Sequence, residues 1–196
     1  IPDSETERIL SQLRRETQNI VLIGMPGCGK STVGAALAAL TGREAIDIDQ
    51  RIEARAGCSI PEIFAQGGEA AFRALEQEET ALAGACSGKI LLTGGGVVTV
   101  EANYASLHQN GRIYHLLRSL DTLATDGRPL SQGADLAAMW QRRAPLYARF
   151  RDAEADNNGT AEETAAAIWR DFCVHCGSER SESEHAGHPA AGDLRT

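Results

Sequence analysis

Short apolar runs alternate along the chain with longer segments in which apolar residues recur every three or four positions. The runs predict strands at residues 19–23, 45–49, 89–93, 112–117 and, more weakly, 152–156. The intervening segments have the spacing of amphipathic helices. Strands that alternate with helices in this way pack as a parallel sheet with helices on both faces. The pattern therefore predicts an α/β fold with three layers, α/β/α, around a five-stranded parallel sheet.

The expected helices differ in how clearly their ends are marked. A final helix is predicted after the Asn157-Asn158-Gly159 turn, where Thr160 and Glu163 form a capping box. The pair Gly67-Gly68 is expected to separate two helices, and Pro145 to interrupt another. The other expected helices cover residues 32–40, 50–57, 60–66, 69–85, 102–108, 120–125 and 134–150. Their periodic apolar residues are expected to face inward, namely Val33, Leu37, Leu40, Phe72, Leu75 and Leu82.

The two ends of the chain differ from its middle in composition. Residues 1–18 predict a short amphipathic helix, which indicates an N-terminal extension, a linker or the end of a neighbouring domain. Residues 177–196 are rich in Ser, Glu, His, Gly and Ala and have almost nothing to bury, so we expect a disordered tail. Residues 19–176 then form the one domain. The chain begins at Ile1, so we expect a processed product or a piece of a longer protein, such as a fusion with another enzyme.

Composition narrows the classes of partner. A chain of 196 residues that is 42% apolar suits one domain with a proper core. The net charge of −8 and the pI near 5.1 argue against a nucleic-acid or anionic-membrane surface. No apolar run reaches the ~20 residues that a bilayer span requires, and five cysteines without a repeated spacing fit reduced thiols. We therefore expect a soluble cytoplasmic monomer whose partners are small molecules.

A glycine-rich loop gives the strongest chemical signal. The run Gly24-Met25-Pro26-Gly27-Cys28-Gly29-Lys30-Ser31 fits G-x-x-x-x-G-K-[ST] without a mismatch, between an apolar run and a helix-like segment. Glycines let backbone N–H groups turn toward phosphate oxygens, and the helix N-terminus adds partial positive charge. Lys30 would reach the β- and γ-phosphates, and the Ser31 hydroxyl would be a ligand of Mg²⁺. The alternative is a glycine-rich turn that binds nothing, but the flanking elements favour a nucleoside triphosphate site. Its residues are Gly27, Cys28, Gly29, Lys30, Ser31 and Thr32.

Two aspartates follow the second expected strand. Asp47 and Asp49 are separated by one residue, so on a strand they share a face, or they fan out together where the strand ends, at the edge of the sheet where ligands bind. One carboxylate could hold Mg²⁺ through water, and the other could accept a hydroxyl proton. The alternative interpretation is a solvated strand end, which the pair alone would favour.

Two further features lie downstream. Glu69, Arg73 and Glu76 have the helical spacing of surface ion pairs, which by itself is ordinary. The run Gly94-Gly95-Gly96 directly after a strand is less ordinary, because flexible residues at the ligand edge allow backbone to approach a ligand closely.

Together these segments resemble the shikimate kinase family. The matching segments are GMPGCGKST at 24–32, DID at 47–49, SIPEIFAQGGEAAFRALE at 59–76, TGGG at 93–96, RPL at 128–130 and RRAPLY at 142–147. They occur in the family's order over about residues 19–173. The glycine loop alone indicates only the P-loop NTPase superfamily, whereas the other segments narrow the resemblance to this family. The resemblance implies a P-loop fold of the nucleoside-monophosphate-kinase type with a mobile lid.

The resemblance also implies an activity and its residues. The activity is transfer of the γ-phosphoryl group of ATP to the 3-hydroxyl of shikimate, with Mg²⁺ bound near Ser31 and Asp47. Asp49 would contact the ring hydroxyls and act as the base or position it, and Glu76 would orient Arg73. Guanidinium groups suit a planar carboxylate. The implied substrate-binding residues are Asp49, Phe64, Phe72, Arg73, Glu76, Gly94, Gly95, Gly96 and Arg143, with Arg73 and Arg143 on the carboxylate.

The lid of this chain departs from the family pattern. Arg128 matches the lid arginine that moves over the γ-phosphate, where it would neutralise charge with Lys30 and Mg²⁺. Many relatives carry further arginines ahead of it, one of which packs on adenine. Here residues 123–127 occupy that place without an arginine. We expect a short lid with a weaker hold on adenine or a different closure.

Two other functions stay open. One is a small-molecule kinase of the same architecture, such as a gluconokinase or a nucleoside monophosphate kinase, although 5% aromatic residues offer little surface for stacking an acceptor base. The other is a non-catalytic sensor that binds shikimate or nucleotide. Lys30, Ser31, Asp49 and Arg128 together argue against a sensor, since binding alone does not need groups poised for transfer.

Several cysteines and histidines are expected to be structural. Cys173 and Cys176 with His185 and His188 suggest zinc, but two of these ligands would come from the tail, so we do not expect a zinc site. Cys28 is expected mainly to fill space inside the loop. The lone histidines His108 and His115 are likewise expected to be structural.

Overall fold

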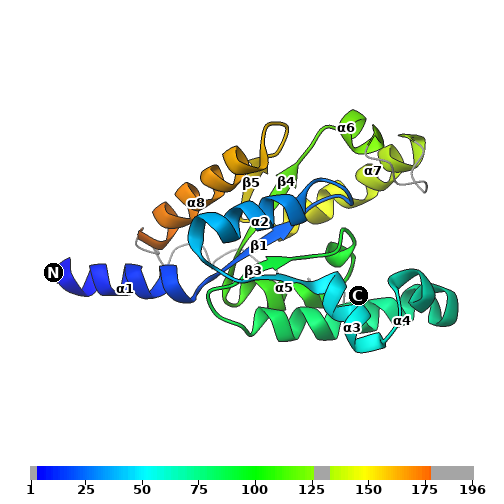
Figure 1. Ribbon diagram of the computed structural model, residues 1–196, viewed down its shortest axis with the longest axis horizontal. Coiled ribbons are helices and arrows are strands. Elements are labelled where there is room, and N and C mark those ends of the chain that lie inside the picture. Colours follow the sequence, from blue (N-terminus) through cyan, green and yellow to red (C-terminus); the bar gives the residue numbers. More distant parts are fainter. Residues whose placement is uncertain (1–3, 126–132, 178–196) are drawn as a thin grey trace, which may run out of the picture.

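Five strands form one sheet in the order β2-β3-β1-β4-β5, and every pairing is parallel (Figure 1). The computed structural model describes residues 4–125 and 133–177. The central strand β1 is buried along its whole length, with Val21 level with Leu91 on one side and Ile113 on the other. The strands are β1 Asn19–Ile23, β2 Ala45–Asp47, β3 Ile90–Leu92, β4 Gly111–Leu117 and β5 Ala153–Asp156.

Helices cover both faces of this sheet, which confirms the predicted three-layer α/β/α fold. Helices α2 and α8 pack together on one face, while α5 and α7 pack against β4 on the other. The helices are α1 Ser4–Thr17, α2 Lys30–Thr41, α3 Ile48–Ala56, α4 Ile60–Gly84, α5 Ala102–His108, α6 Leu120–Thr125, α7 Gly133–Phe150 and α8 Ala161–Gly177, with a 3-10 turn at Val97–Thr99.

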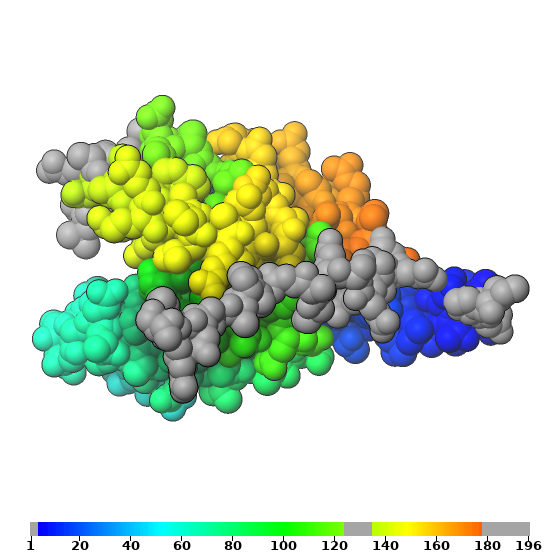
Figure 2. All heavy atoms as spheres, turned by 180° about the vertical axis from the view of Figure 1, so that it is seen from behind, coloured from blue at the N-terminus to red at the C-terminus, as the bar shows by residue number. Residues whose placement is uncertain are grey.

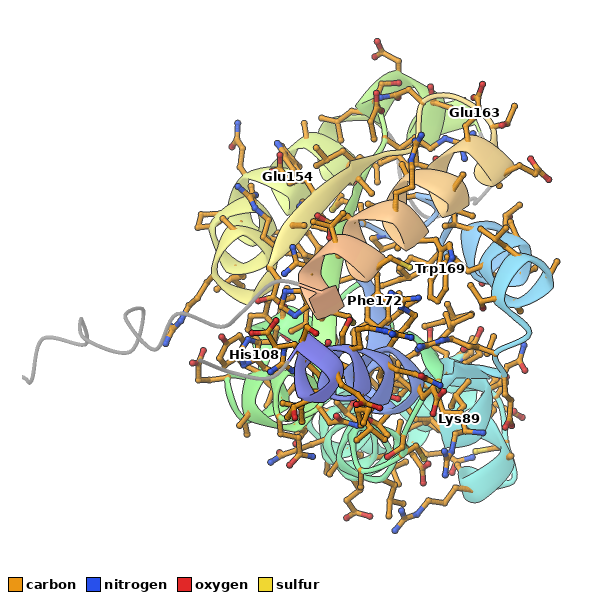
Figure 3. All side chains as sticks on the ribbon, turned by 90° about the vertical axis from the view of Figure 1, so that its left-hand side faces the viewer. Lys89, His108, Glu154, Glu163, Trp169 and Phe172 are labelled. Atoms are coloured by element: carbon orange, nitrogen blue, oxygen red, sulfur yellow. The ribbon has the colours of Figure 1, made fainter. Side chains whose placement is uncertain are left out.

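Helix α8 packs beside α2 in the helical layer on one face of the sheet. Its aromatic residues Trp169 and Phe172 stack with ring centroids 5.7 Å apart (Figure 3). The Arg43 guanidinium carbon lies 4.9 Å from the Phe172 centroid. The helix begins as predicted, since Thr160 N donates to Glu163 Oε2 at 2.9 Å and Glu163 N donates to Thr160 Oγ1 at 3.2 Å.

One predicted helix break is confirmed and the other is wrong. At Gly68 the backbone leaves the helical conformation, with φ 70° and ψ −172°, so two helical segments meet at a kink within α4. Pro145 lies inside α7, which continues to Phe150. The neighbouring Tyr147 and Phe150 are buried, and this packing outweighs the backbone hydrogen bond that a proline removes.

Two predicted core positions are also wrong. Leu40 is 52% exposed and Leu82 is 51% exposed, although both follow the helical spacing of buried neighbours. Leu40 lies in the last turn of α2, and Leu82 lies beside Ala83 and Gly84, which α4 buries in its place. Val33, Leu37 and Phe72 are buried as predicted.

The N-terminal end of the described chain adds little to the core. Helix α1 forms as predicted but buries no residue, and it projects from one end of the molecule beside α8 (Figure 1). Residues 126–132, which include the predicted lid segment, and the tail from 178 lie outside the described residues. Among the described helices, none is both long and apolar enough to cross a membrane.

Candidate active site

The phosphate loop joins β1 to α2 at the carboxyl edge of the sheet. Gly24, Gly27 and Gly29 all have positive φ, at 152°, 79° and 97°, which explains why glycine occupies these positions. A Cβ on Gly29 would also lie 2.5 Å from Asn157 Nδ2. Helix α2 starts directly after the loop at Lys30, so the N–H groups of its first turn border the loop and favour an anion there.

Lys30 lies folded along the loop. Its Nζ donates to Gly24 O at 2.9 Å and to Met25 O at 3.1 Å. Cys28 is buried below it, with its Sγ 3.7 Å from the same ammonium group, which fits the expected space-filling role. Ser31 and Thr32 follow in the first turn of α2, and both are exposed.

The two aspartates lie where the strand ends, which is the second of the two predicted arrangements, and they do not share a strand face. Strand β2 ends at Asp47, whose Oδ1 accepts a hydrogen bond from Gln50 N at 3.2 Å and so caps α3. Asp49 lies in the first turn of that helix. The capping bond turns the chain two residues earlier than predicted. Both aspartates nevertheless line one cavity of about 330 Å³ together with Lys30 and Ser31.

The segment Gly94–Gly96 lies where β3, α3, α4 and the phosphate loop meet. A Cβ on Gly94 would be 2.8 Å from Asp49 Oδ1 and 3.1 Å from Glu76 Oε1. A Cβ on Gly95 would be 2.7 Å from the Pro26 ring of the phosphate loop. On Gly96, a Cβ would overlap the Arg73 guanidinium. The three glycines therefore allow contacts that any larger residue would block.

Arg73 is held by two glutamates of its own helix, α4. Its Nη1 donates to Glu76 Oε2 at 2.7 Å, and its Nη2 contacts Glu69 Oε1 at 3.2 Å. Glu76 is 0% exposed, so this pair is not the surface pair that its spacing by itself suggested. Burial raises the pKa of Glu76, while the hydrogen bond and charge of Arg73 lower it. The ion pair with Glu76 therefore fixes the direction in which the Arg73 side chain leaves helix α4.

Helix α7 reaches the same glycine segment from the opposite side. Gly95 O accepts hydrogen bonds from Arg143 Nη1 at 3.2 Å and from Tyr147 Oη at 2.6 Å. Arg73 and Arg143 therefore approach Gly94–Gly96 from different helices. Figure 2 shows α7, in yellow, above α4, in cyan to green, on one face of the molecule.

His115 of β4 lies under α7. It is 1% exposed and stacks on Tyr147 with ring centroids 4.6 Å apart, and on Trp140 at 5.9 Å. Neither of its ring nitrogens has a hydrogen-bond partner among the described residues. Burial, with smaller contributions from Arg151 and Lys30, lowers its pKa to about 4. The imidazole is therefore neutral near neutral pH and serves as packing surface, as expected for a structural histidine.

The two predicted apolar site residues differ in exposure. Phe64 and Phe72 stack with centroids 4.8 Å apart, and the Arg73 guanidinium carbon lies 5.1 Å from the Phe72 centroid. Phe72 is buried, whereas Phe64 is 37% exposed. The pair borders Arg73 on the α4 side of the site.

The predicted site residues are largely brought together. Asp49, Arg73, Glu76 and Arg143 contact or closely approach Gly94–Gly96, and Asp49 shares a cavity with Lys30. Arg128 lies outside the described residues.

The site contains residues that were not foreseen, among them Tyr147 and Asn157. Tyr147 belongs to the RRAPLY segment, which is the signal that could have found it. Asn157, whose Nδ2 donates to Cys28 O at 2.7 Å, looked like a turn residue only.

The described residues contain no group of three or more potential metal ligands. Cys173 and Cys176 lie on α8, and Cys176 is buried. The histidines that would have joined them, His185 and His188, lie outside the described residues.

A family model and the curated relatives name the same family. A family model described as shikimate kinase matches residues 26–172. A shikimate kinase of Synechococcus sp. is 41% identical over 144 residues, which are 68% of this chain and 73% of that protein. One of Xanthomonas oryzae pv. oryzae is 40% identical over 163 residues, 78% of this chain and 91% of its own. The structure of shikimate kinase from Acinetobacter baumannii in complex with shikimate superposes with a TM-score of 0.77 at 32% identity, covering 84% of this chain and 98% of that chain.

Proposed function

The chain belongs to the shikimate kinase family and is an ATP-dependent kinase for shikimate, and we propose that it phosphorylates the 3-hydroxyl with the residues assigned below. The assignment rests on the side chains that converge on the segment Gly94–Gly96. Two guanidinium groups and one carboxylate approach this segment, and the carboxylate faces the cavity of the phosphate loop.

Gly27 to Thr32 bind the phosphates of ATP in this proposal. The backbone N–H groups of the loop and of the first turn of α2 surround the β-phosphate. Lys30 exchanges its bonds to the carbonyls of Gly24 and Met25 for phosphate oxygens, which carry full negative charge. Ser31 and Asp47 hold Mg²⁺, which neutralises charge on the phosphates when it is bound. Hydroxyl and carboxylate oxygens of the same cavity suit this ion, although Asp47 also caps α3.

Arg73 and Arg143 bind the carboxylate of shikimate. A guanidinium presents two parallel N–H groups to a planar carboxylate, so two arginines fix both the position and the plane of the ring. Glu76 holds Arg73 in place through the 2.7 Å ion pair, and Tyr147 helps hold Gly95. Phe72, with Phe64 stacked on it, provides the apolar wall.

Asp49 serves as the base or positions it. The 3-hydroxyl oxygen forms a bond to the γ-phosphorus, the bond from phosphorus to the bridging oxygen breaks, and ADP leaves. The hydroxyl proton passes to the Asp49 carboxylate. Lys30 stabilises the charge that develops on the transferred group, and Arg128, which lies outside the described residues, adds to this stabilisation in the proposal.

A coupled assay of ADP release tests this function. Turnover should require both shikimate and Mg²⁺, and gluconate or a nucleoside monophosphate should not replace shikimate. Turnover with gluconate would favour the other small-molecule kinases. Binding of shikimate and ATP without any turnover would favour the sensor. A product phosphorylated at a different hydroxyl would overturn the assignment of the 3-hydroxyl alone.

A further inference from the structure

Arg118 lies on the loop that follows β4 and lines the phosphate cavity. The same cavity is lined by Lys30, Asp47 and Asp49. Among the described residues that line this cavity, Lys30 and Arg118 are cationic, and their positive charges balance the negative charges of the two aspartates. A bound polyphosphate adds several negative charges at once. Each cation that faces the cavity therefore affects how tightly a nucleotide binds.

The Arg118 guanidinium and the Lys30 ammonium lie beside different parts of the phosphate loop. Its Nη1 lies 3.6 Å from the position that a Cβ of Gly29 would occupy, directly before the first residue of α2. The Lys30 ammonium instead lies against the carbonyls of Gly24 and Met25 at the start of the loop. The two cations thus border the loop at opposite ends.

The backbone that carries Arg118 is tied to the phosphate loop. Ser119 N donates to Asn158 Oδ1 at 2.9 Å. The adjacent Asn157 donates from Nδ2 to Cys28 O at 2.7 Å and accepts from Thr164 Oγ1 at 2.8 Å. Three loops at the carboxyl edge of the sheet are therefore hydrogen-bonded to one another. This arrangement fixes the base of the Arg118 side chain relative to Gly29.

Arg118 also lines a second cavity of different character. Besides the polar phosphate cavity, it lines one of about 300 Å³ with apolar neighbours such as Leu116, Leu120 and Trp140. A nucleoside triphosphate likewise joins an apolar base to a charged chain, and the phosphates nearest the nucleoside lie at the junction. A guanidinium at this junction faces those phosphates rather than the γ-phosphate, which is close to Lys30 and Asp49 in the proposed mechanism.

We propose that Arg118 binds the phosphate oxygens of the nucleotide on its nucleoside side, as a second cationic ligand besides Lys30. This assignment rests on the proposed function only in that ATP is the phosphoryl donor. A guanidinium can make two parallel hydrogen bonds to a phosphate and keeps its charge at every relevant pH.

Titration with ADP in the absence of acceptor tests the proposal. Arg118→Ala should weaken ADP binding about tenfold or more, as expected when a hydrogen bond to a charged group is lost. Arg118→Lys should fall between wild type and Arg118→Ala, because it keeps the charge but loses the fork. The salt dependence of ADP binding should also become shallower in Arg118→Ala. The matched control is Arg149→Ala, which removes an exposed arginine paired with Glu101 and should leave ADP binding within about twofold.

Steady-state kinetics then distinguish a loss of nucleotide binding from a general disturbance of the active site. The KM for ATP should rise in Arg118→Ala, while the KM for shikimate stays near that of wild type. Unchanged ADP binding in Arg118→Ala, an equal loss in Arg149→Ala, or a change confined to the KM for shikimate would overturn the proposal. Because ADP binding is measured without acceptor, the result stands even if shikimate is not phosphorylated at the 3-hydroxyl.

Discussion

Arg73 and Glu76 form an ion pair, with Nη1 and Oε2 2.7 Å apart, in which the carboxylate is completely buried and the guanidinium lies against Gly96. Burying a carboxylate costs free energy that a single ion pair seldom recovers in full. The raised pKa of Glu76 reflects this cost. We infer that the pair orients Arg73 for the substrate rather than stabilising the fold.

Replacing Glu76 by Gln tests that inference. Glu76→Gln keeps the shape of the side chain but weakens the hold on Arg73, so the KM for shikimate should rise about tenfold. The KM for ATP should change little, since Lys30 and the phosphate loop do not contact Glu76 directly. A normal KM for shikimate in this variant would show that Arg73 is oriented without Glu76.

The same variant makes a prediction about pH. Because the pKa of Glu76 is raised in the folded state, the folded protein retains this proton at pH values where the unfolded chain has lost it. The contribution of Glu76 to stability is therefore complete below its ordinary pKa and is lost as pH rises through the folded pKa. Glu76→Gln should gain free energy of unfolding relative to wild type as pH increases from about 4.5. Denaturant unfolding at several pH values measures this difference, and a constant difference would contradict the prediction.

Asp49→Asn is expected to remove activity while leaving the nucleotide site intact. An amide cannot accept the hydroxyl proton, so kcat should fall by several orders of magnitude. Binding of ATP, followed by titration with a nonhydrolysable analogue, should stay close to wild type. Near-full turnover in this variant would remove Asp49 from the mechanism.

Tyr147→Phe should weaken shikimate binding through the backbone of Gly95. The change removes the 2.6 Å hydrogen bond to Gly95 O and leaves that carbonyl with Arg143 as its described side-chain donor. The loss of one buried hydrogen bond should raise the KM for shikimate about threefold to tenfold. Tyr104→Phe is the matched control, because Tyr104 packs on His108 and Phe150 and not on the glycine segment. Equal effects of the two variants would mean that Tyr147 acts only through packing.

His115 makes the stability of the fold depend on pH. Its pKa is about 4 in the folded state, below the ordinary 6.5. The contribution of His115 to the free energy of unfolding is therefore complete above about pH 6.5. It is lost as the pH falls toward 4, because in that range the unfolded chain takes up the proton and the folded protein does not. The loss should amount to about 2 kcal/mol over this range.

His115→Phe provides the comparison. Phenylalanine keeps a ring stacked on Tyr147 and Trp140 but cannot titrate, so the variant should lose less free energy of unfolding than wild type at acidic pH. Denaturant unfolding at about pH 7.5 and about pH 4.5 measures both proteins. Parallel losses in the two proteins would assign the acid sensitivity to other groups.

Much of the architecture followed from local sequence. All five strands, the final capping box and the phosphate loop were predicted, because each depends on neighbours within a few positions. The errors arose where packing outweighed a local signal. Pro145 stays inside α7 because buried residues follow it, and Leu40 is exposed in the last turn of α2 although it lies on the helical face of Val33 and Leu37.

The sequence by itself determined that a phosphate loop, two aspartates, a glycine run and separate arginines occur on one chain in the order of one family. Only the tertiary structure decided which of these meet. It buried Glu76 beneath Arg73, brought α7 to the carbonyl of Gly95 and placed Arg118 beside Gly29. The physical reason is that periodicity and turn chemistry act between neighbours along the chain. Burial and charge pairing act between residues that only the packed sheet and its helices bring together.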